Sequence, residues 1–240
     1  MGWLAREATV RRIVDGVLNG RAPIVLGGPG MGRTTVLVAA AERLRERGFE
    51  PALLELGDEA TDPGSARGVA LRSGGLELHR ALAKGRGLRE LDGRLVQRVP
   101  LVPLLRRDLR AWAAAAGVAL AEDDLERSFH ASGGHPSVFA AWLDAHRFTR
   151  APEALEERAL AASRALFVRI DAALAHPELA KPWSWLALRR RSSVEEMRRA
   201  TGAGKGVLDR LALAGPVSRT LGASAEIAAT CGLYLRHARG

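Results

Sequence analysis

Apolar residues in the first quarter of the chain follow two different spacings. Between positions 8 and 18 they recur at helical spacing, as Val10, Ile13, Val14, Val17 and Leu18, which predicts an amphipathic helix. Positions 22–26 and 51–56 are short, continuous apolar runs, and runs of this length bounded by turn residues predict buried strands. A further helix is expected over 34–47, closed by Gly48.

The next segment repeats this alternation less clearly. Positions 68–71 read as a third strand, 76–83 as a helix, and 94–104 as a fourth strand that leads into a helix. Strands that alternate with helices predict crossover connections and a parallel sheet. The first 103 residues are therefore expected to form an α/β domain.

From position 104 onward the helical spacing dominates. Helices are expected over 104–116, 123–131, 137–148 and 152–175, separated by short breaks. We interpret 104–177 as a helical domain and 178–240 as a third domain. The latter begins with a helix containing Trp183 and Trp185, followed by a helix–turn–helix over 192–213 and two short strands, 217–220 and 226–229. Ser192 and Ser193 precede Glu195 and Glu196 by three residues each, which predicts reciprocal capping at the start of a helix.

Composition narrows the class of protein. No apolar run approaches the ~20 residues of a membrane span, and the N-terminal residues lack the apolar core of a secretory signal. One cysteine, Cys231, leaves no intramolecular disulfide and no cysteine-rich metal cluster. We therefore expect a cytoplasmic protein with no membrane partner.

The net charge leaves two interpretations open. The chain has 36 Lys and Arg against 27 Asp and Glu, a formal charge of +9. The excess fits a solvated basic surface, and it also fits a functional basic face for nucleic acid or an acidic partner. The charges are distributed along the chain rather than in blocks, so no disordered charged tail is indicated.

The most specific pattern is a glycine-rich loop between the first expected strand and the second expected helix. Its residues are Gly27, Gly28, Pro29, Gly30, Met31, Gly32, Arg33, Thr34 and Thr35. Glycines let the backbone turn its N–H groups inward toward an anion, and the helix that starts near Arg33 adds its positive end. Thr34 is the residue expected to place a hydroxyl on Mg²⁺ beside the phosphates of ATP or ADP.

One position of the loop departs from the usual pattern. Arg33 stands where lysine normally reaches the β- and γ-phosphates, and the planar guanidinium has a different reach. Backbone amides supply much of the binding, so affinity is expected to survive, whereas placement of the transition state is less favoured. Asp58 and Glu59 follow the second expected strand and are the candidate acids for holding the metal and activating water. They also fit ordinary loop acids.

These motifs resemble the STAND class of P-loop ATPases, which are signal-transducing relatives of AAA+ proteins. Arg6 and Glu7 match the entry sequence of that class, whereas Ala5 and Ala8 depart from it. The loop matches apart from Arg33, and the Gly133-Gly134-His135-Pro136 stretch is similar to the Gly-x-Pro element of the helical lid. The resemblance implies that Arg6 and Pro136 contact the nucleotide, with Pro136 near the adenine.

The same resemblance implies the rest of the architecture. Residues 104–177 correspond to the lid, and 183–238 resemble the winged-helix domain of bacterial and archaeal members. Residues 57–95 look shorter than the class needs, because 69–74 and the stretch up to 104 resemble its fourth and fifth strands. A degenerate member is implied, in which the strand bearing the acidic pair is missing or merged.

Three functions follow as hypotheses. The favoured one is an ATP- or ADP-dependent switch, with slow or absent hydrolysis, whose winged helix moves to expose a surface for a protein partner or for self-association. The second is a winged-helix DNA-binding regulator in which Lys205, Arg210, Arg219 and 189–191 meet phosphates. The third is an inert scaffold whose glycine loop no longer binds nucleotide.

Overall fold

The computed structural model describes residues 6–56, 69–75, 78, 90–91, 93–219 and 225–238. Contacts divide the chain into two compact units. The sheet unit comprises Arg6–Gly27 and Gly32–Leu101, and the helical unit comprises Gly28–Met31 together with the chain from Val102 onward. The further division of the second unit after residue 177 stays a prediction.

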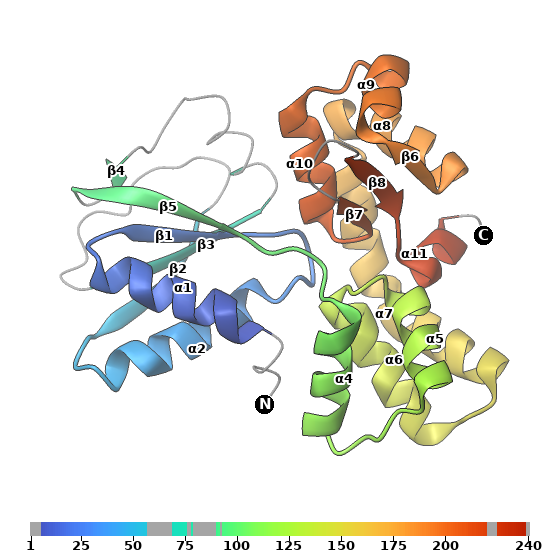
Figure 1. Ribbon diagram of the computed structural model, residues 1–240, viewed down its shortest axis with the longest axis horizontal. Coiled ribbons are helices and arrows are strands. Elements are labelled where there is room, and N and C mark those ends of the chain that lie inside the picture. The colour runs from blue at the N-terminus through green and yellow to red at the C-terminus, as the bar shows by residue number, and fades with distance from the viewer. Residues whose placement is uncertain are drawn as a thin grey trace. The chain divides into compact units, whose positions relative to one another are not determined.

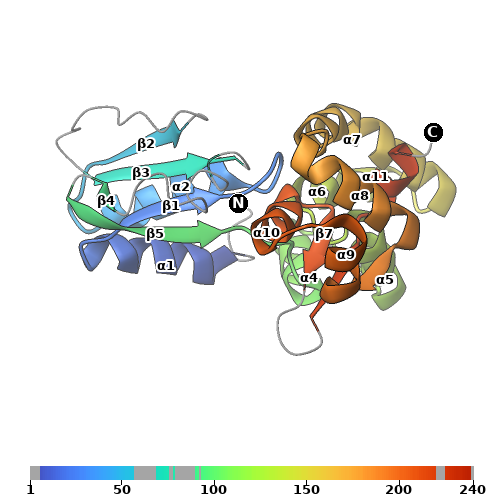
Figure 2. The ribbon, with the colours of Figure 1, turned by 90° about the horizontal axis from the view of Figure 1, so that it is seen from above.

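The sheet unit contains a mainly parallel five-stranded sheet. Its elements are α1 (Glu7–Leu18), β1 (Ala22–Leu26), α2 (Arg33–Arg45), β2 (Pro51–Leu56), β3 (Val69–Gly74), β4 (Glu90–Leu91) and β5 (Arg94–Pro100). The strand order is β2-β3-β1-β5-β4, and Figure 2 shows the first four side by side. These four run parallel, whereas the short β4 pairs antiparallel with β5. The predicted parallel α/β sheet is confirmed.

Helices α1 and α2 pack beside each other and against the sheet (Figure 1). The buried face of α1 carries Val10, Ile13, Val14 and Val17, the residues whose spacing predicts the helix. The Arg43 guanidinium donates two hydrogen bonds to the Glu7 carboxylate at 2.6 Å, and this pairing lowers the pKa of Glu7. Because both side chains are partly exposed, we regard this ion pair as a modest tie between the two helices.

The helical unit consists of a helical layer followed by a smaller mixed region. Its elements are α4 (Arg106–Ala115), α5 (Glu122–Ser132), α6 (Pro136–Phe148), α7 (Pro152–Leu174), α8 (Pro177–Arg189), β6 (Arg191–Ser193), α9 (Val194–Thr201), α10 (Lys205–Ala214), β7 (Val217–Arg219), β8 (Glu226–Ala229) and α11 (Gly232–His237). The last three strands form an antiparallel sheet in the order β6-β8-β7. No helix in the described part of the chain is long and apolar enough to cross a bilayer.

Aromatic side chains connect distant segments of the helical unit. Phe167 on α7 meets Tyr234 on α11 edge to face, and Trp183 on α8 also packs on Tyr234. Tyr234 is fully buried, and its hydroxyl donates to the carboxylate of Asp171. The last helix is thereby fixed to α7 and α8, although its own six residues are too few to form a stable isolated helix.

Most expected elements are confirmed, with differences at short or tertiary-dependent segments. β4, β6 and α11 have no counterpart among the predicted elements, and the helix expected over 76–83 falls, apart from Leu78, outside the described residues. The reciprocal capping is half right: the Ser193 hydroxyl accepts from the Glu196 amide at 3.1 Å. The Glu196 carboxylate instead accepts from the Ser192 hydroxyl at 2.7 Å.

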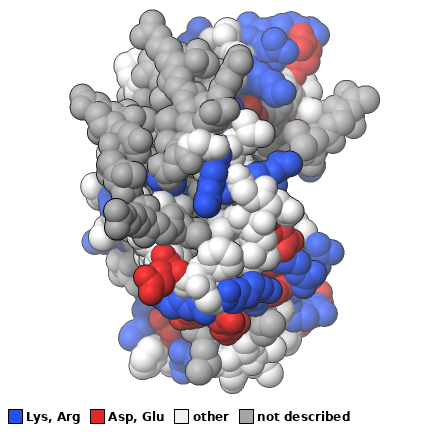
Figure 3. All heavy atoms as spheres, turned by 90° about the vertical axis from the view of Figure 1, so that its left-hand side faces the viewer, with Lys and Arg blue, Asp and Glu red and all other residues white. Residues whose placement is uncertain are grey.

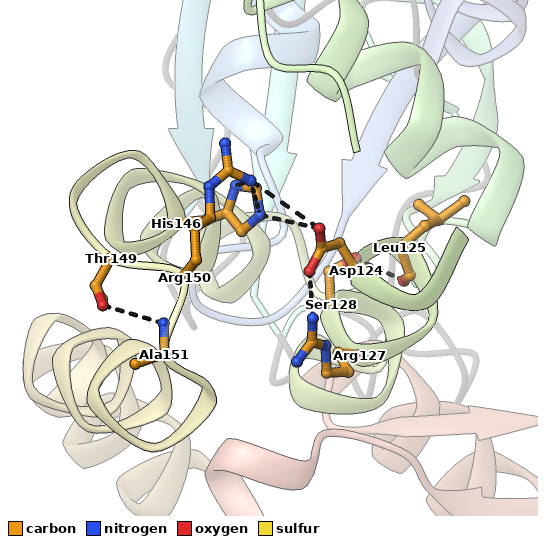
Figure 4. Close-up of polar contacts among 8 residues, drawn as sticks. All are labelled: Asp124, Leu125, Arg127, Ser128, His146, Thr149, Arg150 and Ala151. Atoms are coloured by element: carbon orange, nitrogen blue, oxygen red, sulfur yellow. Dashed lines mark hydrogen bonds and ion pairs between the residues drawn. The ribbon is translucent and has the colours of Figure 1, made fainter. Parts of the chain in front are cut away.

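A buried histidine lies at the centre of a polar cluster between α5 and α6 (Figure 4). The His146 side chain is fully buried, stacks on Trp142 with ring centroids 4.9 Å apart, and lies 3.4 Å from the Asp124 carboxylate. The Arg150 guanidinium contacts the same imidazole, and Arg127 donates to Asp124 at 2.5 Å. Burial lowers the pKa of His146, and the Asp124 hydrogen bond opposes this only in part.

This cluster predicts a loss of stability in mild acid. Because the pKa of His146 is lower in the folded protein than its ordinary value near 6.5, the unfolded chain binds the proton more tightly. The contribution of the buried, neutral His146 to the free energy of unfolding is therefore fully present above pH ~6.5. It is lost as the pH falls below this value, at up to ~1.4 kcal/mol per pH unit. Urea unfolding of the wild type and of His146→Gln at pH ~7.5 and pH ~5.2, on either side of the ordinary histidine pKa, measures this. The variant is expected to lose less stability between the two values, and equal losses would contradict the assignment.

Candidate functional site

The glycine-rich loop joins the end of β1 to the start of α2. Gly27 remains in the sheet unit, where its amide donates to the Gly74 carbonyl at 3.3 Å. Gly30 and Gly32 have φ values of 71° and 83°, in the left-handed region that favours glycine. α2 begins at Arg33 with Gly32 as its N-cap, so the expected strand–loop–helix order is confirmed.

The first turn of α2 presents the chemistry of an anion site. The amides of a helix's first turn have no acceptor within the helix, and the helix dipole places a partial positive charge there. Thr34 and Thr35 are exposed in this turn, and Arg33 is partly exposed. An alanine Cβ at Gly32 would meet nothing closer than 4.0 Å, which leaves this end of the helix open. These groups fit a phosphate chain, and the Thr34 hydroxyl fits Mg²⁺ beside it.

The segment Gly28–Met31 belongs to the helical unit and is held there by three hydrogen bonds. The Gly28 amide donates to the Leu213 carbonyl at 2.7 Å, at the end of α10. His135 Nε2 lies 3.0 Å from the Pro29 carbonyl oxygen, and the Ser137 hydroxyl donates to the Gly30 carbonyl oxygen at 2.8 Å. In the sequence, His135 is the variable residue of the Gly-x-Pro element, with no role of its own, and Ser137 does not stand out. Residues more than 100 positions apart leave no local signal of such contacts.

Close packing explains Gly28 better than backbone conformation does. A Cβ at this position would lie 2.8 Å from the Ala214 Cα and the Leu213 carbonyl oxygen. Gly215, just beyond α10, is similarly enclosed: a Cβ there would lie 2.5 Å from the His135 ring and 2.9 Å from the sulfur of Met31. Gly28 and Gly215 therefore let α10 approach the loop, a role for Gly28 that the phosphate-loop motif does not indicate.

The candidate acids Asp58 and Glu59 fall outside the described residues, and what the structure describes is the end of the strand that precedes them. Leu26, Gly74 and Leu56 are level in the register, so β1, β3 and β2 end at the same edge. The last residue of β2, Leu56, lies about 10 Å from β1, two strand spacings away. β3 pairs with both β1 and β2 and ends in Arg72-Ser73-Gly74. The strand beside the glycine loop thus brings no carboxylate to this edge.

Two other predicted nucleotide contacts lie at helix starts. Arg6 immediately precedes α1 in the sheet unit, and Pro136 is the first residue of α6 in the helical unit. Gly133 and Gly134, with φ of 59° and 76°, end α5 just before it. A Cβ on Gly134 would approach the Leu104 carbonyl oxygen to 2.1 Å. This Gly-Gly pair is therefore required by the backbone path, and a shared role of Arg6 and Pro136 in one pocket stays a prediction.

Comparison with known proteins identifies the fold. No protein-family model matches the chain, and no curated protein matches its sequence. A solved structure of the Walker-type ATPase PABY2304 of Pyrococcus abyssi is similar over 97% of this chain and 96% of its own, with 13% identity and a TM-score of 0.60. The chain shares the fold of this Walker-type ATPase.

Two further solved structures are more distant. The Aeropyrum pernix ORC1 protein, solved in complex with DNA, covers 97% of this chain and 91% of its own at 12% identity and a TM-score of 0.39. RuvB of Thermotoga maritima covers 93% and 90% at 13% identity and a TM-score of 0.41. At these scores neither adds to the argument.

The packing of Gly28 predicts a specific sensitivity to one methyl group. Gly28→Ala forces a Cβ against backbone atoms of α10, which cannot move as a side chain tip can, and overpacking of this kind costs ~1–3 kcal/mol. Gly206→Ala is the matched control, because it lies within α10 with nothing within 4 Å and alanine favours a helix. Urea unfolding is expected to show destabilisation for the first variant and none for the second. Equal stability of the two variants would contradict the contact.

Proposed function

We propose that this protein is a molecular switch that binds ATP or ADP with Mg²⁺ through Gly27–Thr35. The observation that carries the proposal is the glycine loop between a fully buried parallel strand and the open first turn of α2. Likeness to a Walker-type ATPase over nearly the whole chain supports it. Arg6, Arg33 and Pro136 are proposed to complete the nucleotide contacts, with Thr34 on the metal.

The proposed switching rests on the division of the glycine loop between the sheet unit and the helical unit. Gly27 and the residues from Gly32 onward belong to the sheet unit, whereas Gly28–Met31 belong to the helical unit. A ligand bound by Gly28–Met31 therefore acts on backbone atoms that α6 and the end of α10 also bind. A nucleotide shifts a conformational equilibrium only if it binds one conformation of the protein more tightly than the other.

Weak or absent hydrolysis is part of the same proposal. Efficient hydrolysis requires a residue that positions water and groups that stabilise charge on the γ-phosphate. Arg33 replaces the usual lysine, and β3, beside β1, ends without an acid. We propose that Asp58 and Glu59, which follow β2, supply whatever hydrolysis occurs, and that the chain is a degenerate member of the STAND-like ATPases.

We propose that α8 to β8 form a winged helix that serves a protein partner or self-association. The order helix, strand, two helices and two strands, with the sheet β6-β8-β7, supports this assignment. Its second helix, α10, is the one that would enter a DNA groove, yet Leu208, Leu211 and Leu213 on it are buried. The partly exposed positions of α10 include Gly206, Val207 and Ala212, which offer no polar groups for reading bases and favour a protein-facing role.

The DNA-binding alternative loses one of its predicted phosphate contacts. The Arg210 side chain is only 2% exposed and forms an ion pair with Glu178 of α8. Its burial follows from its position on the face of α10 that packs against α8. Arg189 and Arg191 are also engaged, with Glu196 and Glu226. Figure 3 draws the side on which the sheet unit lies in Figure 1, so it does not bear on α8 to β8; the basic side chains visible there lie beside acidic ones. No observation therefore favours duplex binding over the switch.

Nucleotide binding is tested with two glycines that flank α2, one in the phosphate loop and one at the opposite end of the helix. Gly32 and Gly48 flank the two ends of the helix, have φ of 83° and 81°, and are both in open space. Valine at either position imposes the same backbone strain, so both variants should lose similar thermal stability. Calorimetric titration is expected to show micromolar binding of ADP and ATP to wild type and Gly48→Val, and none to Gly32→Val. Unchanged affinity in Gly32→Val would overturn the proposal.

Hydrolysis is tested by phosphate release. Wild type is expected to turn over ATP no faster than roughly 10⁻³ s⁻¹, the range of an unassisted P-loop hydrolase. If the acids after β2 supply this rate, Glu59→Gln or Asp58→Asn should lower it further without weakening ADP binding. A rate unaffected by either change would remove these residues from the site, and a rate above roughly 1 s⁻¹ would contradict the degenerate assignment.

A further inference from the structure

The tip of the glycine loop is a β-turn of defined type. The Met31 amide donates to the Gly28 carbonyl at 3.3 Å, which closes a turn over Gly28–Met31. Proline fixes φ near about −65° at the second position, and Gly30 has φ of 71° at the third. This combination defines a type II turn. Type I differs from it by a flip of the central peptide, here Pro29–Gly30, so the turn has two discrete alternatives.

Two side chains at the start of α6 bind this turn. His135 Nε2 donates to the carbonyl of the central peptide, and the Ser137 hydroxyl donates to the carbonyl of the next one. The fit is close: a Cβ on Gly30 would lie 2.8 Å from His135 Cε1 and 2.9 Å from Ser137 Oγ. Glycine is thus required at position 30 for two reasons: its positive φ, and the close approach of these two side chains.

The bound carbonyls determine where the amides point. In a trans peptide the C=O and N–H bonds are antiparallel, so holding the Pro29 carbonyl toward His135 turns the Gly30 N–H away from α6. His135 is fully buried. A flip to type I would direct the Gly30 N–H at that buried ring, where no phosphate can reach it. Of the two alternatives, the type II turn leaves this amide available to an anion.

We propose that His135 and Ser137 are positioning residues for phosphate binding, which hold the Pro29–Gly30 peptide so that the Gly30 amide faces the nucleotide. The flip of this peptide is the two-state element that connects nucleotide occupancy to the helical unit, because the flipped state releases the His135 bond. The inference rests on the proposed function, since it assigns residues to the same nucleotide site.

The test compares variants that remove or retain the donor. His135→Leu removes the hydrogen bond and keeps the bulk, whereas His135→Gln retains an N–H at similar reach. Ser137→Ala and Ser137→Thr form the second pair. Kd values for ADP and ATP are measured by calorimetry with Mg²⁺, and thermal melting without nucleotide reports the structural cost of each change.

The variants are expected to differ in their affinity for ADP but not in their melting temperature. His135→Leu should bind ADP roughly 10- to 100-fold more weakly, the loss of about one amide–phosphate hydrogen bond, whereas His135→Gln should stay within about threefold of wild type at a similar melting temperature to the leucine variant. Ser137→Thr should likewise bind more tightly than Ser137→Ala.

Two other results have distinct meanings. If wild type binds nucleotide and the leucine and glutamine variants bind alike, the positioning role is overturned while the proposed function stands. If wild type binds neither nucleotide, the proposed function fails and this inference fails with it.

Discussion

The backbone groups of Gly27–Met31 must find partners that the sheet alone cannot supply, and much of the structure depends on this constraint. An unpaired buried amide or carbonyl costs as much as a lost hydrogen bond. Gly27 pairs with the neighbouring strand, Gly28 with the end of α10, and the next two carbonyls with the start of α6. The helical unit thus contributes to the conformation of a loop that sequence motifs assign entirely to the strand and helix around it.

Glycine serves two different purposes in this chain. At Gly30 and Gly32 glycine is needed for its backbone conformation, because a residue with a β-carbon is strained at positive φ. At Gly28 a side chain would collide with backbone, and the reason is the approach of another segment. Both uses produce the same letters in a phosphate-loop motif. The motif therefore locates the loop correctly while concealing that some of its glycines serve packing.

The order of the strands in the sheet determines which residues lie beside the glycine loop. Parallel strands deliver their carboxyl ends to one edge, which is where ligands of open α/β sheets bind. In this chain β1 has β3 and β5 as neighbours, and β2 lies one strand farther out. Binding of phosphates needs only the loop and the start of α2. Hydrolysis would also need acids at a particular distance from them, and β3, beside β1, ends without one.

Local pattern alone determined the parallel sheet, the glycine loop and most helices, because strand and helix periodicity are recorded within a few residues. β1, β2 and β8 have the bounds that their apolar runs predict. Tertiary structure decided what no window of sequence records. Arg210 is predicted among the cations that meet DNA phosphates but is buried against Glu178. His135, the variable residue of the Gly-x-Pro element, contacts a carbonyl more than 100 residues away. The short α11 also depends on packing, because its burial against α7, rather than its own propensity, stabilises it. Periodicity reports which face of an element is apolar, whereas the partner of that face is set by the chain path.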